Sequence, residues 1–129
     1  MSRHLLVAAI VVLAATASGR AEDMPRQLAP ELIATEHQYC KTSTGYGRDF
    51  TRFVDVDGDG RKDVVLDYAQ ALCGGQPEPY CASDGCLLKV WVSAGGGWRK
   101  VFEGRAERWT VEPHDGRSTL MIDGRPLPR

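Results

Sequence analysis

The chain has 129 residues, of which 16 are lysine or arginine and 17 are aspartate or glutamate, so its formal net charge is −1. This balance excludes the positive electrostatic footprint that is typical of a nucleic-acid-binding protein. The length and a hydrophobic content of 43% are those of one small globular domain.

The N-terminus has the pattern of a secretory signal peptide. Arg3 is followed by an uncharged run of 13 residues, from Leu5 to Ala17, which is shorter than the about 20 residues that a membrane-spanning helix needs. We therefore expect residues 1–21 to be removed by a cut after Ala21, although a cut after Ala17 suits the same small-residue rule. The alternative is that this segment forms a buried N-terminal helix of the domain.

Residues 22–129 are then expected to form a single domain that contains the acidic loop described below. Because Arg3 and Arg20 are lost with the signal, 14 basic residues face 17 acidic ones, a net charge of −3. We expect this domain to be periplasmic or secreted, with no membrane contact after signal cleavage.

The first element predicted in the domain is a helix from Glu31 to Cys40, which carries apolar residues at roughly helical spacing and is stopped by Gly45 and Gly47. Short runs of aromatic and β-branched residues predict strands at Phe50 to Val54 and at Val64 to Tyr68. The alternative for the second run is a helix, because residues 69–72 are good helix formers.

The remaining elements are strands that follow an irregular loop, and turns rich in glycine separate them. They are predicted at Leu87 to Ser93, Trp98 to Phe102, Arg108 to Val111 and Ser118 to Ile122. Pro126 and Pro128 are expected to end the chain without further pairing. The predicted fold class is therefore α+β, with one N-terminal helix packed on an antiparallel β-meander of about five or six strands and stapled by disulfides.

Alternation gives the strand from Leu87 to Ser93 two different faces. Leu88, Val90 and Val92 lie on one face, and Lys89, Trp91 and Ser93 lie on the other. An outward Trp91 would join the two other tryptophans, Trp98 and Trp109, in an aromatic platform for a sugar or a peptide. The alternative is that the helix covers this second face.

Four cysteines remain in the domain, namely Cys40, Cys73, Cys81 and Cys86. An even number of cysteines in a small exported domain predicts disulfides, and four cysteines allow three pairings. We favour Cys81 with Cys86, because the residues between them form turns readily, and therefore Cys40 with Cys73. A zinc site is the alternative, although no two cysteines have CxxC spacing.

One motif indicates a specific chemistry, the acidic loop Asp55-x-Asp57-x-Asp59-Gly60-x-x-Asp63. Calcium is a hard cation that takes roughly six to eight oxygen ligands, and carboxylates at alternate positions of a tight loop can all point inward. The predicted metal ligands are Asp55, Asp57, Asp59, the backbone carbonyl of Arg61, and Asp63. The alternative is an acidic hairpin loop that holds no ion.

These residues resemble the calcium loops of EF-hands and, more closely, the DxDxDGxxD loops of dockerins and of the FG-GAP repeats in integrin α-subunit propellers. The resemblance covers the segment from Phe53 to Leu66. It departs from the EF-hand at Leu66, where that loop has a bidentate glutamate, and at Lys62, where it has a branched apolar residue. Because the preceding segment is short and rich in β-formers, the resemblance favours a strand–loop–strand site over a helix–loop–helix sensor.

A broader similarity is to a group of small exported bacterial proteins of unknown function. It depends on the acidic loop followed by Leu66-Asp67-Tyr68, on Cys73-x-Gly75, on the segment from Cys81 to Gly85-Cys86, and on Val90-Trp91-Val92. This similarity assigns no activity.

The sequence contains no nucleophile or acid–base constellation typical of an active site, and His37 and His114 are interpreted as surface residues, so we expect that the protein is not an enzyme. The predicted function is an exported, non-catalytic binding or structural module whose acidic loop binds calcium and is stabilised by it, with an unknown protein or glycan partner. The alternative is a small secreted inhibitor of a hydrolase, for which disulfides and an exposed rigid loop from Gly74 to Cys86 are suitable.

Overall fold

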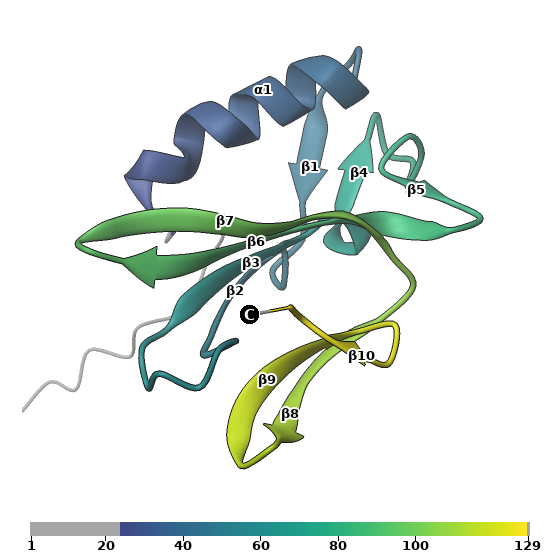
Figure 1. Cartoon of the computed structure of the whole chain (residues 1–129). Coiled ribbons are helices and arrows are strands. Elements are labelled where there is room, and N and C mark those ends of the chain that lie inside the picture. The colour runs from purple at the N-terminus through teal and green to yellow at the C-terminus, as the bar shows by residue number, and fades with distance from the viewer. Residues whose placement is uncertain (1–23, 129) are drawn as a thin grey trace, which may run out of the picture.

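The computed structural model describes residues 24–128, so the expected signal peptide lies outside the described residues. Three layers are visible in Figure 1, with a helix above a central β-sheet and a second sheet below it. None of the helices described in this part of the chain combines the length and the apolar character that a membrane span requires.

The elements follow one another mostly as strands after a single α-helix. They are the 3₁₀ helix η2 (Arg26–Leu28), α1 (Ala29–Tyr39), β1 (Thr44–Tyr46), β2 (Thr51–Val54), β3 (Asp63–Asp67), the 3₁₀ helix η3 (Tyr68–Gln70), β4 (Ala71–Cys73), β5 (Cys81–Ala82), β6 (Gly85–Ala94), β7 (Gly97–Ala106), β8 (Trp109–His114), β9 (Arg117–Ile122) and β10 (Arg125–Pro126). Each strand predicted from the sequence is present, as β2, β3, β6, β7, β8 and β9.

Helix α1 begins at Ala29, slightly earlier than the sequence predicts. Pro30 lies in its first turn, where backbone N–H groups make no hydrogen bond within the helix, so the N–H that proline lacks is not needed. The helix ends at Tyr39, because Cys40 has an extended backbone with φ of −119° and ψ of 117°. The N–H of Cys40 still donates to the carbonyl of Glu36 at 2.8 Å and completes the last turn.

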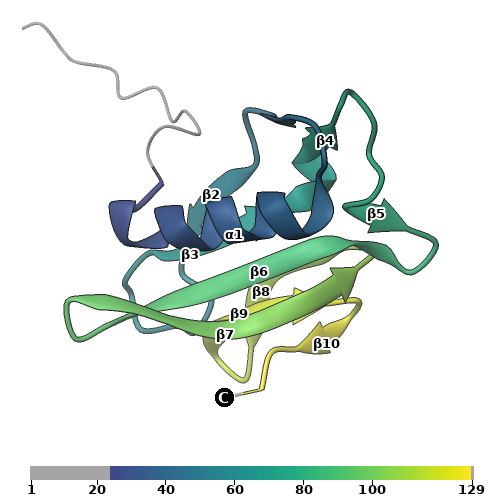
Figure 2. The ribbon, with the colours of Figure 1, turned by 90° about the horizontal axis from the view of Figure 1, so that it is seen from above.

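The strands form three antiparallel sheets, and the prediction of a single meander is therefore wrong. The central sheet has the order β2-β3-β6-β5, with β7 also paired to β6, while β10-β9-β8 form a second sheet and β1-β4 a small third one. After β7 the N–H groups of Glu107 and Arg108 both donate to Oδ1 of Asp123, at 2.9 and 3.0 Å. These bonds fix the chain at the point where it leaves the central sheet, so that β8 does not pair with β7 and pairs with β9. Figure 2 shows β8 and β9 beneath the central sheet.

Several short elements were not predicted from the sequence, among them β1, β4, β10 and the 3₁₀ helix η3. Strand β1 pairs with β4 around Gly45, which was expected only to stop the helix. Pro126 was expected to be unpaired but pairs with Met121 in β10, which is an edge strand and so tolerates a residue without an N–H. Residues 68–70 form η3 and residues 71–73 form β4, so the alternative of a helix after Val64 is wrong.

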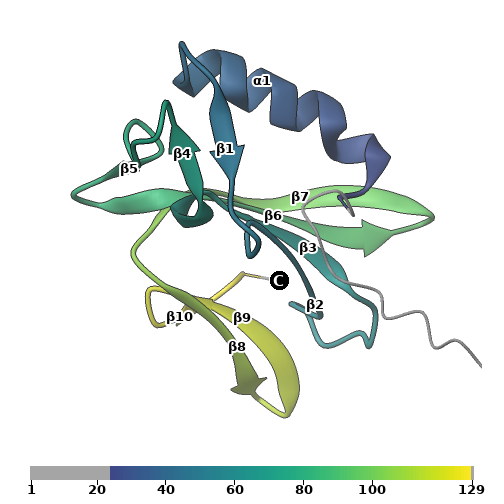
Figure 3. The same ribbon diagram turned by 180° about the vertical axis from the view of Figure 1, so that it is seen from behind.

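The hydrophobic core has two parts, one on each face of the central sheet. The part beneath α1 contains Leu28, Phe50, Leu66, Tyr68, Tyr80 and Trp91, and Figure 3 shows α1 above this face from behind. The part between the two sheets contains Val56, Val65, Leu88, Val90, Val92 and Leu120. Trp91 is only 5% exposed, so the helix covers the second face of β6 and Trp91 forms no outward platform.

Two disulfides join Cys40 to Cys73 and Cys81 to Cys86. The first connects the end of α1 to β4 across a sequence separation of 33, which stabilises the fold by about 3–4 kcal/mol through the entropy of the unfolded chain. The second closes a separation of 5 beside β5. Because all four cysteines of the chain are paired, none offers a thiolate to zinc.

A buried lysine connects the helix to the central sheet. Lys89 on β6 is 3% exposed, and its Nζ donates to Thr35 Oγ1 at 2.7 Å and to Glu31 Oε1 at 3.1 Å. Glu103 Oε1 on β7 lies 2.8 Å from the same Nζ. The three N–H donors of the ammonium therefore all have acceptors, which makes its burial tolerable.

Lys100 completes this ion-pair cluster and contributes to its pH dependence. Its Nζ lies 2.6 Å from Glu31 Oε1 and 3.3 Å from Glu103 Oε2. The hydrogen bond from Lys100 is the largest cause that lowers the pKa of Glu31, and the bond from Lys89 is the largest that lowers the pKa of Glu103. Both carboxylates therefore stabilise the folded state when they are ionised.

Glu31→Gln should lower the free energy of unfolding by about 1 kcal/mol at pH 7. Because the folded pKa of Glu31 lies below its ordinary value of 4.5, its contribution is present above that value and is lost as the pH falls through the folded pKa. Urea titrations at pH 7 and pH 3 should show that the difference from the unmodified protein shrinks at the lower pH. Glu112→Gln on β8 is the matched control, and an equal loss at both pH values would contradict the ion-pair account.

Candidate metal site

The acidic loop connects β2 to β3, so it has the strand–loop–strand form that the resemblance favoured. Val54 at the end of β2 pairs with Asp63 at the start of β3. Asp55, Asp57, Asp59 and Asp63 each offer one carboxylate oxygen, and these four atoms all lie within 4.8 Å of one another. The structure thus brings together the four aspartates predicted as ligands, while a ligand role for the Arg61 carbonyl stays a prediction.

Asp55 organises the backbone of the loop. Its Oδ1 accepts from the N–H groups of Gly58 at 2.8 Å and Asp57 at 3.3 Å, and its Oδ2 accepts from Gly60 at 2.8 Å. Burial raises the pKa of Asp55, but these N–H donors, with Gly60 the strongest, outweigh burial and hold the pKa below its ordinary value. The loop therefore stabilises Asp55 as a carboxylate.

Asp57 and Asp59 differ in their surroundings, because Asp57 is half-buried and Asp59 is exposed. Burial, followed by the negative charge of Asp63, raises the pKa of Asp57. Asp59 accepts from the backbone N–H of Arg61 at 2.8 Å and from its Nε at 3.1 Å, and the backbone bond is the main cause that lowers the pKa of Asp59. A cation would therefore relieve Asp57, while at Asp59 it would compete with the Arg61 side chain.

Asp63 is fully buried and holds the loop to the central sheet. Its Oδ2 accepts from the N–H of Val56 at 2.9 Å, and its Oδ1 accepts from the N–H and the Oγ of Ser93 at 2.9 and 3.3 Å. A carboxylate has about four acceptor positions, so three hydrogen bonds leave one position, on Oδ2, for a cation. Asp63 thus closes the loop with or without an ion.

The loop is also anchored to the second sheet. Val56 is 1% exposed, and its carbonyl accepts from the N–H of Leu120 on β9 at 3.0 Å. Ser118 Oγ donates to the carbonyl of Asp55 at 3.0 Å. The acidic loop therefore contacts β6 through Asp63 and β9 through its backbone, and it lies at the junction of the two sheets.

The donor set decides which cations suit the site. Four carboxylates supply hard oxygen ligands, which favour calcium or magnesium over softer metals. Magnesium demands a small, nearly ideal octahedron, whereas calcium accepts irregular geometry and more ligands. All four carboxylates accept backbone N–H groups, so the structure holds them in place and the cluster could hold a hard cation.

Outside the loop, the predicted surface histidines form no comparable group. His37 is exposed, and His114 Nε2 lies 3.5 Å from Oδ2 of its neighbour Asp115 in a turn. Within residues 24–128, the four aspartates of the loop are the one group of three or more acidic, histidine or cysteine side chains with ligand atoms this close together.

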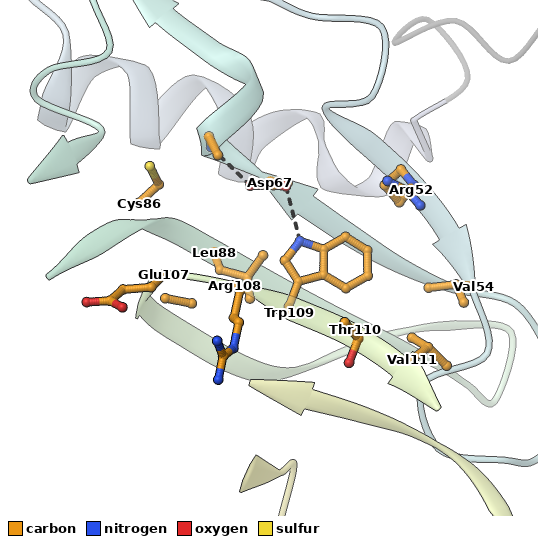
Figure 4. A pocket seen from close by; sticks show the side chains of 12 residues that line it. Arg52, Val54, Asp67, Cys86, Leu88, Glu107, Arg108, Trp109, Thr110 and Val111 are labelled. Carbon is orange, nitrogen blue, oxygen red and sulfur yellow. Dashed lines mark hydrogen bonds between the residues drawn. The ribbon is translucent and has the colours of Figure 1, made fainter. Parts of the chain in front are cut away.

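A second group of polar side chains was missed from the sequence. Trp109 Nε1 donates to Asp67 Oδ2 at 3.0 Å, and the guanidinium carbon of Arg52 lies 5.2 Å from the centroid of the indole ring. These residues border a cleft of about 580 Å³ between the central sheet and β8, drawn in Figure 4. Because Asp67 and Trp109 are 42 residues apart, no local spacing pattern connects them.

No protein-family model, no curated protein and no solved structure matches this chain. The geometry, burial and charges of its own residues are therefore the basis for a function.

Gly58 and Gly60 provide a matched test of how the loop packs. Both have positive φ, +77° and +82°, so alanine is strained at each. A Cβ at Gly58 would also lie 2.9 Å from Cβ of Arg117 and 3.1 Å from the carbonyl oxygen of Ser118, whereas a Cβ at Gly60 meets nothing within 4 Å. Gly58→Ala should lower the free energy of unfolding by about 2–4 kcal/mol and Gly60→Ala by about 1 kcal/mol, measured in urea without calcium. Equal losses would contradict the contact with β9.

Proposed function

We propose that the protein is an exported, non-catalytic binding or structural module, periplasmic or secreted, whose acidic loop binds a calcium ion and is stabilised by it. The observation that carries the proposal is the convergence of four carboxylate oxygens within 4.8 Å. The two disulfides support export, because such bonds persist in oxidising compartments. A protein or glycan partner, of unknown identity, belongs to the same proposal.

A structural role for the ion follows from where the loop lies. Without a cation, backbone N–H groups keep the pKa values of Asp55 and Asp59 low, but burial and the charge of Asp63 raise the pKa of Asp57, so a cation would relieve the loop at Asp57. Asp63 accepts a hydrogen bond from Ser93 on β6, and the carbonyl of Val56 accepts one from Leu120 on β9. An ion that steadies the loop therefore stabilises the junction of the two sheets, and calcium outside the cytoplasm is typically high enough to keep a weak site filled.

Thermal unfolding of the oxidised protein tests this proposal. At about 10 mM calcium the midpoint should rise by about 5 °C or more above the value in excess chelator, through mass-action linkage, while magnesium should raise it much less. Asp57→Asn with Asp59→Asn should abolish the calcium shift, because two of the four charged ligands are lost.

Asp115→Asn is the matched control, since Asp115 is an exposed aspartate in the β8–β9 turn, outside the loop. This variant should keep the full calcium shift. Superimposed melting curves with chelator and with calcium would show that the loop is only an acidic turn. A shift that survives in the double variant would place the ion elsewhere.

A second function, a small secreted inhibitor of a hydrolase, is favoured by the rigidity of the exposed loop at residues 74–86. Arg105 on β7 donates through Nη1 to the carbonyls of Tyr80 at 3.0 Å and Gly85 at 3.3 Å, and through Nη2 to that of Pro79 at 3.2 Å. The Cys81–Cys86 disulfide closes one end of the loop, and buried Tyr80 anchors it. A loop held in this way loses little conformational entropy when it enters an active-site cleft.

The inhibitor hypothesis predicts that equimolar protein slows a secreted hydrolase, such as a lysozyme or a serine protease, equally with calcium and with chelator. Arg105→Lys should weaken the inhibition by about tenfold, because lysine cannot make the forked contact, while Arg99→Lys should leave it unchanged. If a panel of such enzymes keeps full activity with the protein in micromolar excess, this second function is wrong.

A further inference from the structure

The cleft beside Trp109 has the dimensions of a small-molecule site. Its volume of about 580 Å³ falls within the usual range of roughly 300–1,000 Å³. Buried Leu88 and Ala106 contribute apolar surface, and Trp109 and Val111 line it from β8. Both sheets contribute to the cleft, so its shape is set by packing between layers and not by a single loop.

The indole of Trp109 is held in a fixed orientation. Its Nε1 donates to Asp67 Oδ2 at 3.0 Å, and Asp67 Oδ1 accepts from the N–H of Ala69 at 3.0 Å. Each oxygen of the Asp67 carboxylate therefore has a protein donor, and Asp67 acts as a positioning residue for the ring. A partly exposed aromatic ring fixed in this way presents surface to a ligand at little entropic cost.

Two guanidinium groups, of Arg52 and Arg108, and two carboxylates, of Asp67 and Glu107, line the cleft, so its formal charges balance. The guanidinium of Arg52 lies over the Trp109 ring, and Arg108 lines the same cleft; in Figure 4 the two groups lie on either side of the indole. Over the described range, residues 24–128, no carboxylate oxygen lies within 4.0 Å of either group. The carboxylate of Asp67 already accepts from Trp109 and Ala69, and the side chain of Glu107 extends away from the indole in Figure 4. The guanidinium of Arg52 is therefore the charged group beside the ring that is left to bind an anion.

We propose that this cleft binds an acidic carbohydrate, with a sugar ring against Trp109 and the ring's carboxylate on Arg52. A guanidinium matches a carboxylate through two parallel N–H···O bonds, and the flat C–H face of a pyranose fits an indole surface. The exposed Thr110, which also lines the cleft, offers a hydroxyl to the sugar hydroxyls. This inference goes beyond calcium binding and names a ligand class for a different part of the molecule.

An acidic sugar fits this lining better than two other ligand classes. A purely apolar ligand would have to cover charged side chains without replacing their water, which is costly. A neutral sugar would leave both guanidinium groups without the partner they match, so it should bind more weakly. The carboxylate is therefore the specific element of the ligand.

A titration of the oxidised protein with trigalacturonate, followed by amide and indole N–H resonances, tests the proposal. The buffer is freed of calcium on a chelating resin, because uronates themselves bind calcium, and contains about 0.15 M salt to screen unspecific attraction. We expect saturable shifts of the Trp109 indole N–H with a Kd below about 1 mM, and a much weaker response to maltotriose, a neutral trisaccharide of equal length. Arg52→Gln should weaken trigalacturonate binding by about tenfold.

Arg99→Gln is the matched control, because it removes the same charge from an exposed position on β7, outside the cleft lining. It should change the Kd by less than about twofold. Equal binding of maltotriose, an equal loss in Arg99→Gln, or no saturation at about 10 mM ligand would each overturn the proposal. Since calcium is absent, such a failure leaves the acidic-loop proposal intact, and a missing calcium shift leaves the cleft result intact.

Discussion

The buried carboxylate of Asp63 is the interaction on which the arrangement of the sheets depends. A carboxylate removed from water is costly unless its oxygens are bonded, and here Val56 and Ser93 supply three donors. Those bonds draw the β2–β3 loop against β6, and Val56 then accepts from Leu120 on β9. The same carboxylate keeps one acceptor position for a cation, so the group that closes the fold also belongs to the candidate metal site.

Both faces of the central sheet are covered, and on each face polar side chains connect the sheet to the layer that covers it. On the helix side, Lys89 and the Cys40–Cys73 disulfide hold α1 and the end of the helix to the strands. On the other side, the acidic loop meets β9, and Asp67 holds Trp109 of β8. The acidic loop and the cleft therefore involve neighbouring strands of the second sheet, because the loop contacts β9 and β8 lines the cleft.

Local patterns in the sequence were sufficient for most elements and for the acidic loop. Alternation predicted β6 and β7, and the spacing of four aspartates around Gly60 predicted a cluster that the structure confirms. The separation of the second sheet from the central one was not predictable, because it depends on Asp123 accepting from Glu107 and Arg108, 16 and 15 residues earlier. Burial of Lys89 depends in the same way on Glu31 and Thr35, which are 58 and 54 residues distant, and no spacing rule reaches that far.

The most direct test of the central claim, that the acidic loop is a calcium site built on Asp63, is a calcium titration followed by ¹H–¹⁵N spectra. The account predicts saturation at one ion per chain, with the largest shifts at residues 55–63 and at Ser93, whose N–H reports on the Asp63 carboxylate. It also predicts that magnesium at equal concentration moves these resonances less. Shifts that spread over exposed acidic residues elsewhere, leave Ser93 unmoved and do not saturate by about 10 mM calcium would contradict it.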